Sequence, residues 1–226
     1  MITLPHIYTV GGAFFAAVSL LSLADASNPR RLLNFLFWSL IAGSFLAGSI
    51  LGDLGNGLLA FTLAVVGALG LGQGMPKTTS AEERRESAAK RGNLLFLPAL
   101  IIPAVALTGT LIAKQTSWGA HYIDPSQATL ISLVLGALIA VVAAMAWLRP
   151  PLLAPLQEGR PLIDAVGWAA ILPQMLASLG AVFLAAGVGT QVGHVFSQYI
   201  PLDTRTLAVI GYCGGMALFT LIMGNA

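Results

Sequence analysis

The sequence predicts an all-α, polytopic membrane protein with about seven transmembrane segments and a possible broken or re-entrant segment near residues 187–201. Of the 226 residues, 57% are hydrophobic and only 9% are charged, whereas about a quarter of the residues in a soluble domain are charged. Long apolar stretches separate the charges, and about 20 such residues suffice to cross a hydrocarbon core of roughly 30 Å. We therefore expect one integral membrane domain over residues 1–226.

Seven stretches are apolar enough and long enough to cross a bilayer. They are residues 5–24, 33–51, 54–73, 94–113, 126–148, 166–186 and 206–223. The first is predicted to be a retained span, because it lacks the basic flank and small-residue cleavage site of a signal peptide. Between the second and third, residues 52–56 predict a tight turn, since Gly and Asn tolerate positive φ.

The basic residues predict the orientation of these spans. Nine of the eleven fall in every second loop, after the first, third and fifth stretches. They are Arg30, Arg31, Lys77, Arg84, Arg85, Lys90, Arg91, Arg149 and Arg160. Only Lys114 and Arg205 lie on the other side. Because positive loops stay in the cytoplasm, we expect an external N-terminus and, with seven spans, a cytoplasmic C-terminus.

Two cytoplasmic loops carry patterns of their own. In residues 75–93, Ser80 and Glu83 match a capping box and predict a short surface helix. Its charges are either a solvated face that also touches anionic headgroups or a docking site for a cytoplasmic partner. Residues 149–164 carry four prolines, which predict a semi-rigid strap without a continuous helix. The prolines at 98, 103 and 173 predict kinks in the fourth and sixth spans.

The longest uncharged run covers the 36 residues from Ala165 to Ile200. One straight helix of that length would measure about 54 Å, and two complete spans do not fit, so a break is expected. Near its end lies the Gly-rich segment 187–194. Polar, irregular backbone at membrane depth is tolerated where it lines a water-filled cavity, as in many transporters. A re-entrant dip and a plain external loop both fit this segment.

Polar side chains in this region are the candidates for a substrate path. They are Gln174, Ser178, Thr190, Gln191 and His194, together with Asn225 near the end of the sequence, and the predicted backbone break involves Pro173, Gly187, Gly189 and Gly193. Gln174 and Ser178 share a helix face and can hydrogen-bond a small polar or anionic solute. The same pair can equally form interhelical hydrogen bonds, which are common in membranes.

The remaining chemistry excludes several classes of function. No P-loop occurs, the Gly-x-Gly pairs lack a third glycine, and no two histidines have the spacing of a helical zinc site. The sequence has no basic tract of the kind that binds nucleic acid. Cys213 is expected to be a small buried hydrophobic residue. We expect no enzymatic activity, cofactor or metal. The middle of each predicted span lacks Asp, Glu, Lys and Arg, which leaves Na⁺ and H⁺ both open as coupling ions.

Three motifs are similar to those of a known bacterial family. They are residues 27–31 leading into Asn34-x-Leu-Phe-Trp38, residues 79–87 followed by 92–98, and the closing 224–226. Along its whole length the chain resembles the inner-membrane family catalogued as domain of unknown function 979. The resemblance implies one of two membrane subunits of a 5-oxoproline (pyroglutamate) transporter, beside a second hydrophobic subunit.

Together these observations predict a membrane subunit of a secondary transporter for a small anionic metabolite, with 5-oxoproline implied by the resemblance alone. The expected partners are the lipid bilayer, the anion and the second subunit, and the expected location is the bacterial inner membrane. A non-transporting membrane scaffold is the alternative, since small residues recur at four-residue spacing in the spans. The resemblance also implies a chain shorter than typical members, which continue with further hydrophobic segments after the motif at residues 224–226.

Overall fold

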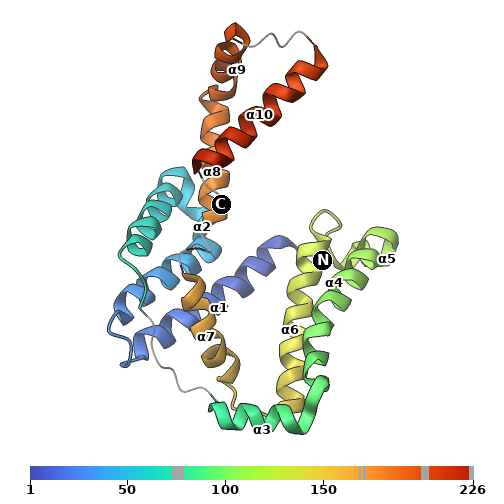
Figure 1. Ribbon diagram of the computed structural model, residues 1–226. Coiled ribbons are helices and arrows are strands. Elements are labelled where there is room, and N and C mark those ends of the chain that lie inside the picture. Colours follow the sequence, from blue (N-terminus) through green and yellow to red (C-terminus); the bar gives the residue numbers. More distant parts are fainter. Residues whose placement is uncertain (73–78, 168, 170–171, 200–203, 224–226) are drawn as a thin grey trace. The chain divides into compact units, whose positions relative to one another are not determined.

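The computed structural model describes the chain except residues 73–78, 168, 170–171, 200–203 and 224–226 (Figure 1). Within the described residues the ordered elements are helices, joined by short connections and by a β-bridge between Ile2 and Ile123. The chain divides into two units, residues 1–169 and 170–226. The all-helical class predicted from the sequence is confirmed.

The first two helices of unit 1 pack against each other in antiparallel fashion. Helix α1 (Leu4–Ala24) meets the beginning of α2 (Arg31–Ala68) through a hydrogen bond of 2.6 Å between the hydroxyls of Ser19 and Ser39. One turn earlier in α1, Phe15 stacks on Trp38 with ring centroids 5.6 Å apart. Small and aromatic side chains therefore build this contact, and the buried hydroxyls satisfy each other.

Helix α2 folds back on itself at Gly52. This glycine has φ 63° and ψ −175°, which L-residues with side chains rarely adopt, so glycine is needed there. A straight helix of 38 residues would measure about 57 Å. Its two ends nevertheless touch, since Arg30 Nη1 donates to the carbonyl of Leu69 at 2.7 Å. The predicted turn over 52–56 is thus one residue, because Asp53 and the residues after it are already helical.

The predicted surface helix is confirmed as α3 (Ala81–Arg91). Ser80 Oγ accepts from the backbone N–H of Glu83 at 3.1 Å, and the Glu83 carboxylate accepts from the Ser80 N–H at 2.8 Å. A 3₁₀ turn, η1 (Gly92–Phe96), leads into α4 (Leu97–Gln115). Pro98 lies in the first turn of α4, where a missing N–H costs nothing, so it starts the helix and does not kink it.

Helix α4 lies beside α6 (Ala128–Leu148), with the short α5 (Ser117–Tyr122) between them in sequence (Figure 1). Glycines set the distance between the two backbones. A Cβ at Gly136 would come within 2.9 Å of the carbonyl oxygen of Ile102, and one at Gly109 within 2.5 Å of Ser132 Oγ. The small residues predicted to allow close helix approach act here within the chain.

From Ala154 onward the proline-rich loop is helical, contrary to the prediction. Helix α7 (Ala154–Val166) forms because Pro155 lies in its first turn, where no backbone donor is needed. Pro161 lies inside the helix and removes only one intrahelical bond. Its exposed side chains include Leu162 and Val166, whereas Arg160 and Asp164 are buried. The helix therefore turns its charges toward the protein.

Unit 2 contains α8 (Leu172–Ala185), α9 (Val188–Tyr199) and α10 (Arg205–Met223). The sixth predicted span is therefore not one helix kinked at Pro173, because α8 begins at the preceding residue and Pro173 occupies its first turn. Gly167, with φ 51°, ends α7 before α8 begins. Only 14 residues, about 21 Å, remain in α8.

Four helical runs of the described chain are long and apolar enough to cross a membrane. They are Leu4–Ala24, Arg31–Ala68, Ala81–Gln115 and Ala128–Leu148. The bent pair Ser178–Ala185 and Val188–Val195 makes a fifth if it counts as one span. This number is lower than the predicted seven partly because α2, folded at Gly52, counts once.

Candidate functional site

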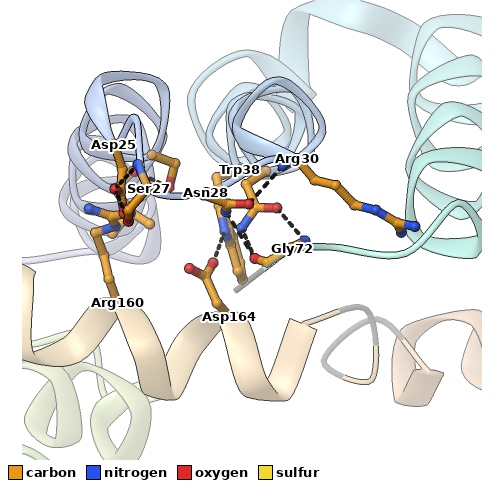
Figure 2. A network of polar contacts seen from close by, with 11 residues as sticks. Asp25, Ser27, Asn28, Arg30, Trp38, Gly72, Arg160 and Asp164 are labelled. Atoms are coloured by element: carbon orange, nitrogen blue, oxygen red, sulfur yellow. Dashed lines mark hydrogen bonds and ion pairs between the residues drawn. The ribbon is translucent and has the colours of Figure 1, made fainter. Parts of the chain in front are cut away.

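A cluster of buried polar side chains joins three helices at one end of unit 1 (Figure 2). We call it the polar node and define it as Asp25, Asn34, Trp38, Arg160 and Asp164. Asp25 caps the C-terminus of α1, Asn34 and Trp38 are one turn apart on α2, and Arg160 and Asp164 are one turn apart on α7. Because residues four apart share a helix face, α2 and α7 each present two polar groups at this place.

Asp25 and Arg160 form a buried ion pair. Arg160 Nη2 donates to Asp25 Oδ2 at 2.8 Å, and the side chains are only 4% and 9% exposed for Arg160 and Asp25 respectively. Ser27 also donates to the Asp25 carboxylate, from its backbone N–H at 3.0 Å and from its hydroxyl at 2.5 Å. Burial alone would raise the pKa of Asp25, but the bonds from Ser27 and Arg160 outweigh it and lower that pKa below 3.8.

Asp164 has a different environment from Asp25. Its Oδ1 accepts from the indole Nε1–H of Trp38 at 2.8 Å, and the residue is 8% exposed. Burial raises the pKa of Asp164 above its ordinary value of 3.8, and the bond from Trp38 and the attraction of Arg160 offset only part of this. The two carboxyl groups of the node thus have pKa values shifted in opposite directions.

The segment after α2 is held to the start of that helix by Asn34. Its amide accepts from the N–H of Gly72 and donates to the carbonyl of Gly72, both at 2.8 Å. Asn28 Nδ2 donates to the same carbonyl at 3.0 Å, and Arg30 Nη1 donates to the carbonyls of Leu69 and Gly70. The amide bonds to Gly72 fix the backbone beside the node (Figure 2), and the Arg30 guanidinium binds backbone carbonyls after α2.

In the node, one guanidinium, that of Arg160, attracts the carboxyl groups of both Asp25 and Asp164. Arg160 and Asp25 are the charges that act on Asp164. Arg160 Nε is buried and has no hydrogen-bond partner, although its Nη2 binds Asp25. A buried unpaired donor costs about 1–3 kcal/mol. The node therefore contains one more negative than positive group and an unused donor, an arrangement that ordinary structural ion pairs avoid.

A second contact ties α7 to the beginning of α3. The Glu158 carboxylate accepts from the backbone N–H of Thr79 at 2.6 Å and also from the Thr79 hydroxyl. These bonds from Thr79, the hydroxyl first, lower the pKa of Glu158 below 4.5. Helix α7 thus connects with the loops that follow both α1 and α2.

The substrate-path residues predicted from the sequence lie in unit 2, apart from Asn225, which is outside the described residues. The break that the sequence predicts is present at Gly187, with φ 66°, and the helices on its two sides are bent by 66°. Gly189 and Gly193 lie inside α9 and do not break it. Gln174 lies in the first turn of α8, and its side chain is outside the described part.

Three of the predicted residues share one face of α9. Thr190, Gln191 and His194 are exposed, and the first two lie four and three positions before His194. Gln198 Nε2 lies 3.4 Å from His194 Nδ1, one turn further on. Ser178, on α8, is exposed as well. The structure therefore brings together the α9 residues by helical periodicity, with the break at their N-terminal end.

The sequence analysis missed the polar node. Two signals point to it: Arg160 and Asp164 are four residues apart in a loop, and Asn34 and Trp38 have the same spacing inside a resemblance motif. What could not be read from the sequence is that these pairs meet. In the described part of the chain no three His, Cys, Asp or Glu side chains group as metal ligands, and Cys213 is exposed, not buried as predicted.

Comparison with known proteins gives one match. No curated protein and no solved structure matches the chain. A family model, described as "Protein of unknown function (DUF979)", matches residues 5–226 and confirms the resemblance stated from the motifs. With its four or five candidate spans, the chain is therefore a multi-pass membrane protein that belongs to the DUF979 family.

Proposed function

We propose that this protein is a membrane subunit of a secondary transporter for a small anionic metabolite. The observation that carries the proposal is the bent pair α8 and α9, which meets at Gly187 inside a stretch of 36 uncharged residues. Transporters commonly build substrate sites from such interrupted helices, because the exposed helix end offers backbone groups and a dipole. The N-terminal, positive end of α9 begins at this break and suits an anion.

The two faces of α9 support a role at a water-filled path. One face carries Thr190, Gln191 and His194, whereas Val188, Val192 and Val195 follow the opposite periodicity. At 12 residues, about 18 Å, the helix is too short to cross the membrane by itself. A short helix with one uncharged polar face can present hydroxyl, amide and imidazole groups to a solute and its apolar face to lipid or protein.

The substrate and the second subunit rest on the family resemblance. We propose 5-oxoproline, a small ring with one carboxylate, as the solute, and a second hydrophobic chain as the partner. The protein acts as a carrier subunit and not as an enzyme, in the bacterial inner membrane. A non-transporting scaffold is the competing role and predicts normal assembly without uptake.

Contacts at the two ends of unit 1 support the orientation that we propose. At one end, Ile2 pairs through its backbone with Tyr122 and Asp124. At the other end, the loops after α1, α2 and α6 meet through the Asp25–Arg160 and Thr79–Glu158 contacts. The second end holds most of the basic residues, so we propose that it is cytoplasmic and that the two arms of α2 are separate spans. Seven spans then result, if α10 is also one.

Uptake of labelled 5-oxoproline tests this function. The chain and its partner are expressed separately and together in cells that lack their own carrier, and uptake is expected only from the pair. Gln191→Ala and His194→Ala should each reduce uptake by about fivefold or more at unchanged membrane abundance, since a site that hydrogen-bonds its substrate loses about 1–3 kcal/mol with one donor. Thr62→Ala, an exposed polar change on α2, is the matched control.

Two results would contradict the proposal. Absence of uptake from every combination would reject 5-oxoproline transport, and a parallel fall of abundance and uptake in the α9 variants would assign those side chains to helix packing. Normal membrane assembly of the pair without any uptake would favour the scaffold.

A further inference from the structure

The predicted spans of this chain lack Asp, Glu, Lys and Arg in their middle, yet the polar node buries three such side chains. Asp25, Arg160 and Asp164 are each at least nine-tenths buried in their side chains or as residues. Together they carry a net charge of −1 when all are ionised. Burying an uncompensated charge costs several kcal/mol, so a node of this composition favours taking up one positive charge.

The hydrogen bonds of the two carboxyl groups indicate which of them takes up the positive charge, as a proton. The Asp25 carboxylate accepts three hydrogen bonds, one from Arg160 Nη2 and two from Ser27, and the first of these comes from a charged donor. Asp164 accepts from the indole N–H of Trp38 and from the side-chain amide of Asn34, and it is also attracted by the Arg160 guanidinium. The group with fewer donors is the one that accepts a proton at lower cost.

Among the residues that the structure describes, the other elements around Asp164 bring no further charge. Asn34 and Trp38 are the node residues of α2, and both are uncharged. The segment that follows α2 contributes the backbone of Gly72, and its neighbour Arg30 donates to the carbonyls of Leu69 and Gly70. Arg160 and Asp25 are thus the charged groups that decide whether Asp164 binds a proton.

We propose that the polar node is a proton-binding site in which Asp164 carries the proton and Arg160 is shared between Asp164 and Asp25. When the proton leaves Asp164 for water, two buried carboxylates compete for one guanidinium, whose Nε has no partner in the present arrangement. Proton binding and the docking of α7 therefore favour each other. This proposal does not depend on the proposed transport function. If the protein is a transporter, Asp164 supplies a carboxyl group of the kind that the middle of the predicted spans lacks.

Infrared difference spectroscopy against pH tests the site in the full chain in lipid nanodiscs, without substrate. We expect a carboxylic-acid C=O band that titrates with a midpoint above 3.8 and is absent from Asp164→Asn. Asp53→Asn, an exposed carboxylate in the bend of α2, is the matched control and should leave the band unchanged. Because no substrate is present, a failure here is distinct from a failure of uptake.

Two further variants should move the midpoint in opposite directions. Asp25→Asn frees Arg160 for Asp164 and should lower the midpoint by about one pH unit, whereas Trp38→Phe removes a donor to the charged form and should raise it. If Asp25→Asn does not fold, Trp38→Phe alone decides. A band that survives Asp164→Asn, or a midpoint that moves in neither folded variant, would overturn the proposal.

Discussion

At the scale of single residues, the buried polar groups of unit 1 depend on backbone partners. Asn34 is fully buried and uses both ends of its amide on Gly72, and Asn28 is almost as buried and bonds the same carbonyl. A buried amide without partners would cost about 1–3 kcal/mol, so these side chains require the close approach of a residue without a Cβ. Gly72 meets that requirement, since a Cβ there would come within 2.2 Å of Asn28 Oδ1.

We therefore expect Gly72→Ala to destabilise the protein by about 1–3 kcal/mol, because the added methyl group displaces Asn28 and strains the three side-chain bonds to the glycine backbone. Gly57→Ala is the control, since nothing lies within 4 Å of its Cβ position and alanine favours the helix. Thermal unfolding in detergent, followed by near-ultraviolet circular dichroism, measures the difference. Equal midpoints for the two variants would contradict the assigned role of Gly72.

At the scale of elements, α7 has the opposite arrangement to a common surface helix. Arg160 and Asp164 lie against the protein, whereas Leu162 and Val166 are exposed. Two hydrogen-bonded contacts, with Trp38 and Thr79, and one ion pair, with Asp25, attach α7 to the rest of unit 1. Such docking responds to protonation, because each carboxylate involved has a pKa that differs from its undocked value.

The pH dependence of α7 docking follows from the signs of these shifts. The pKa of Asp164 is raised above 3.8, so its contribution is present at lower pH and is lost as pH rises through that raised value. The pKa of Asp25 is lowered below 3.8, so its contribution is lost as pH falls through that lowered value. We expect the protection factors of α7 amides, corrected for intrinsic exchange, to be greatest between these two pKa values.

Hydrogen exchange with mass spectrometry measures this profile. Asp164→Asn should remove the loss of protection on the alkaline side and leave the acid side in place. The amides of α6 form the internal control, since that helix has no carboxylate of its own. Uniform protection of α7 across the range would show that its docking does not depend on these carboxyl groups.

At the scale of the whole molecule, unit 1 has two distinct ends. At one end the backbone of Ile2 bonds Tyr122 and Asp124, where α5 leads into α6, and at the opposite end the charged loops contact α7. This alternation agrees with the distribution of basic residues along the sequence. The loops that contact each other at the α7 end are therefore the same loops that carry most of the basic residues.

Cysteine accessibility tests the proposed orientation. Starting from Cys213→Ala, the exposed positions Gln127 and Glu82 are changed singly to Cys. A membrane-impermeant maleimide added to intact cells should label the variant at 127 and reach the variant at 82 only after permeabilisation. The reverse pattern would place the basic loops outside, and labelling of both in intact cells would contradict any opposed placement of the two ends.

Several features could be predicted from the sequence because they depend on neighbouring residues. The all-helical membrane class follows from long uncharged stretches, the capping box of α3 from Ser80 and Glu83, and the break in unit 2 from glycine at position 187. The prediction failed where a local rule competes with context. Four prolines predicted no helix over 149–164, but α7 places Pro155 in its first turn and tolerates Pro161 within.

The sequence by itself determined the class of this protein and its family, because hydrophobicity and short motifs are properties of contiguous residues. Only the tertiary structure decided that Asp25, Trp38 and Asp164 share one buried place, since the hydrogen bond from Trp38 to Asp164 joins residues 126 positions apart. No local pattern records such a distance. An isolated aspartate in a loop and a buried one have the same sequence signal, and they differ only in the water that the fold removes.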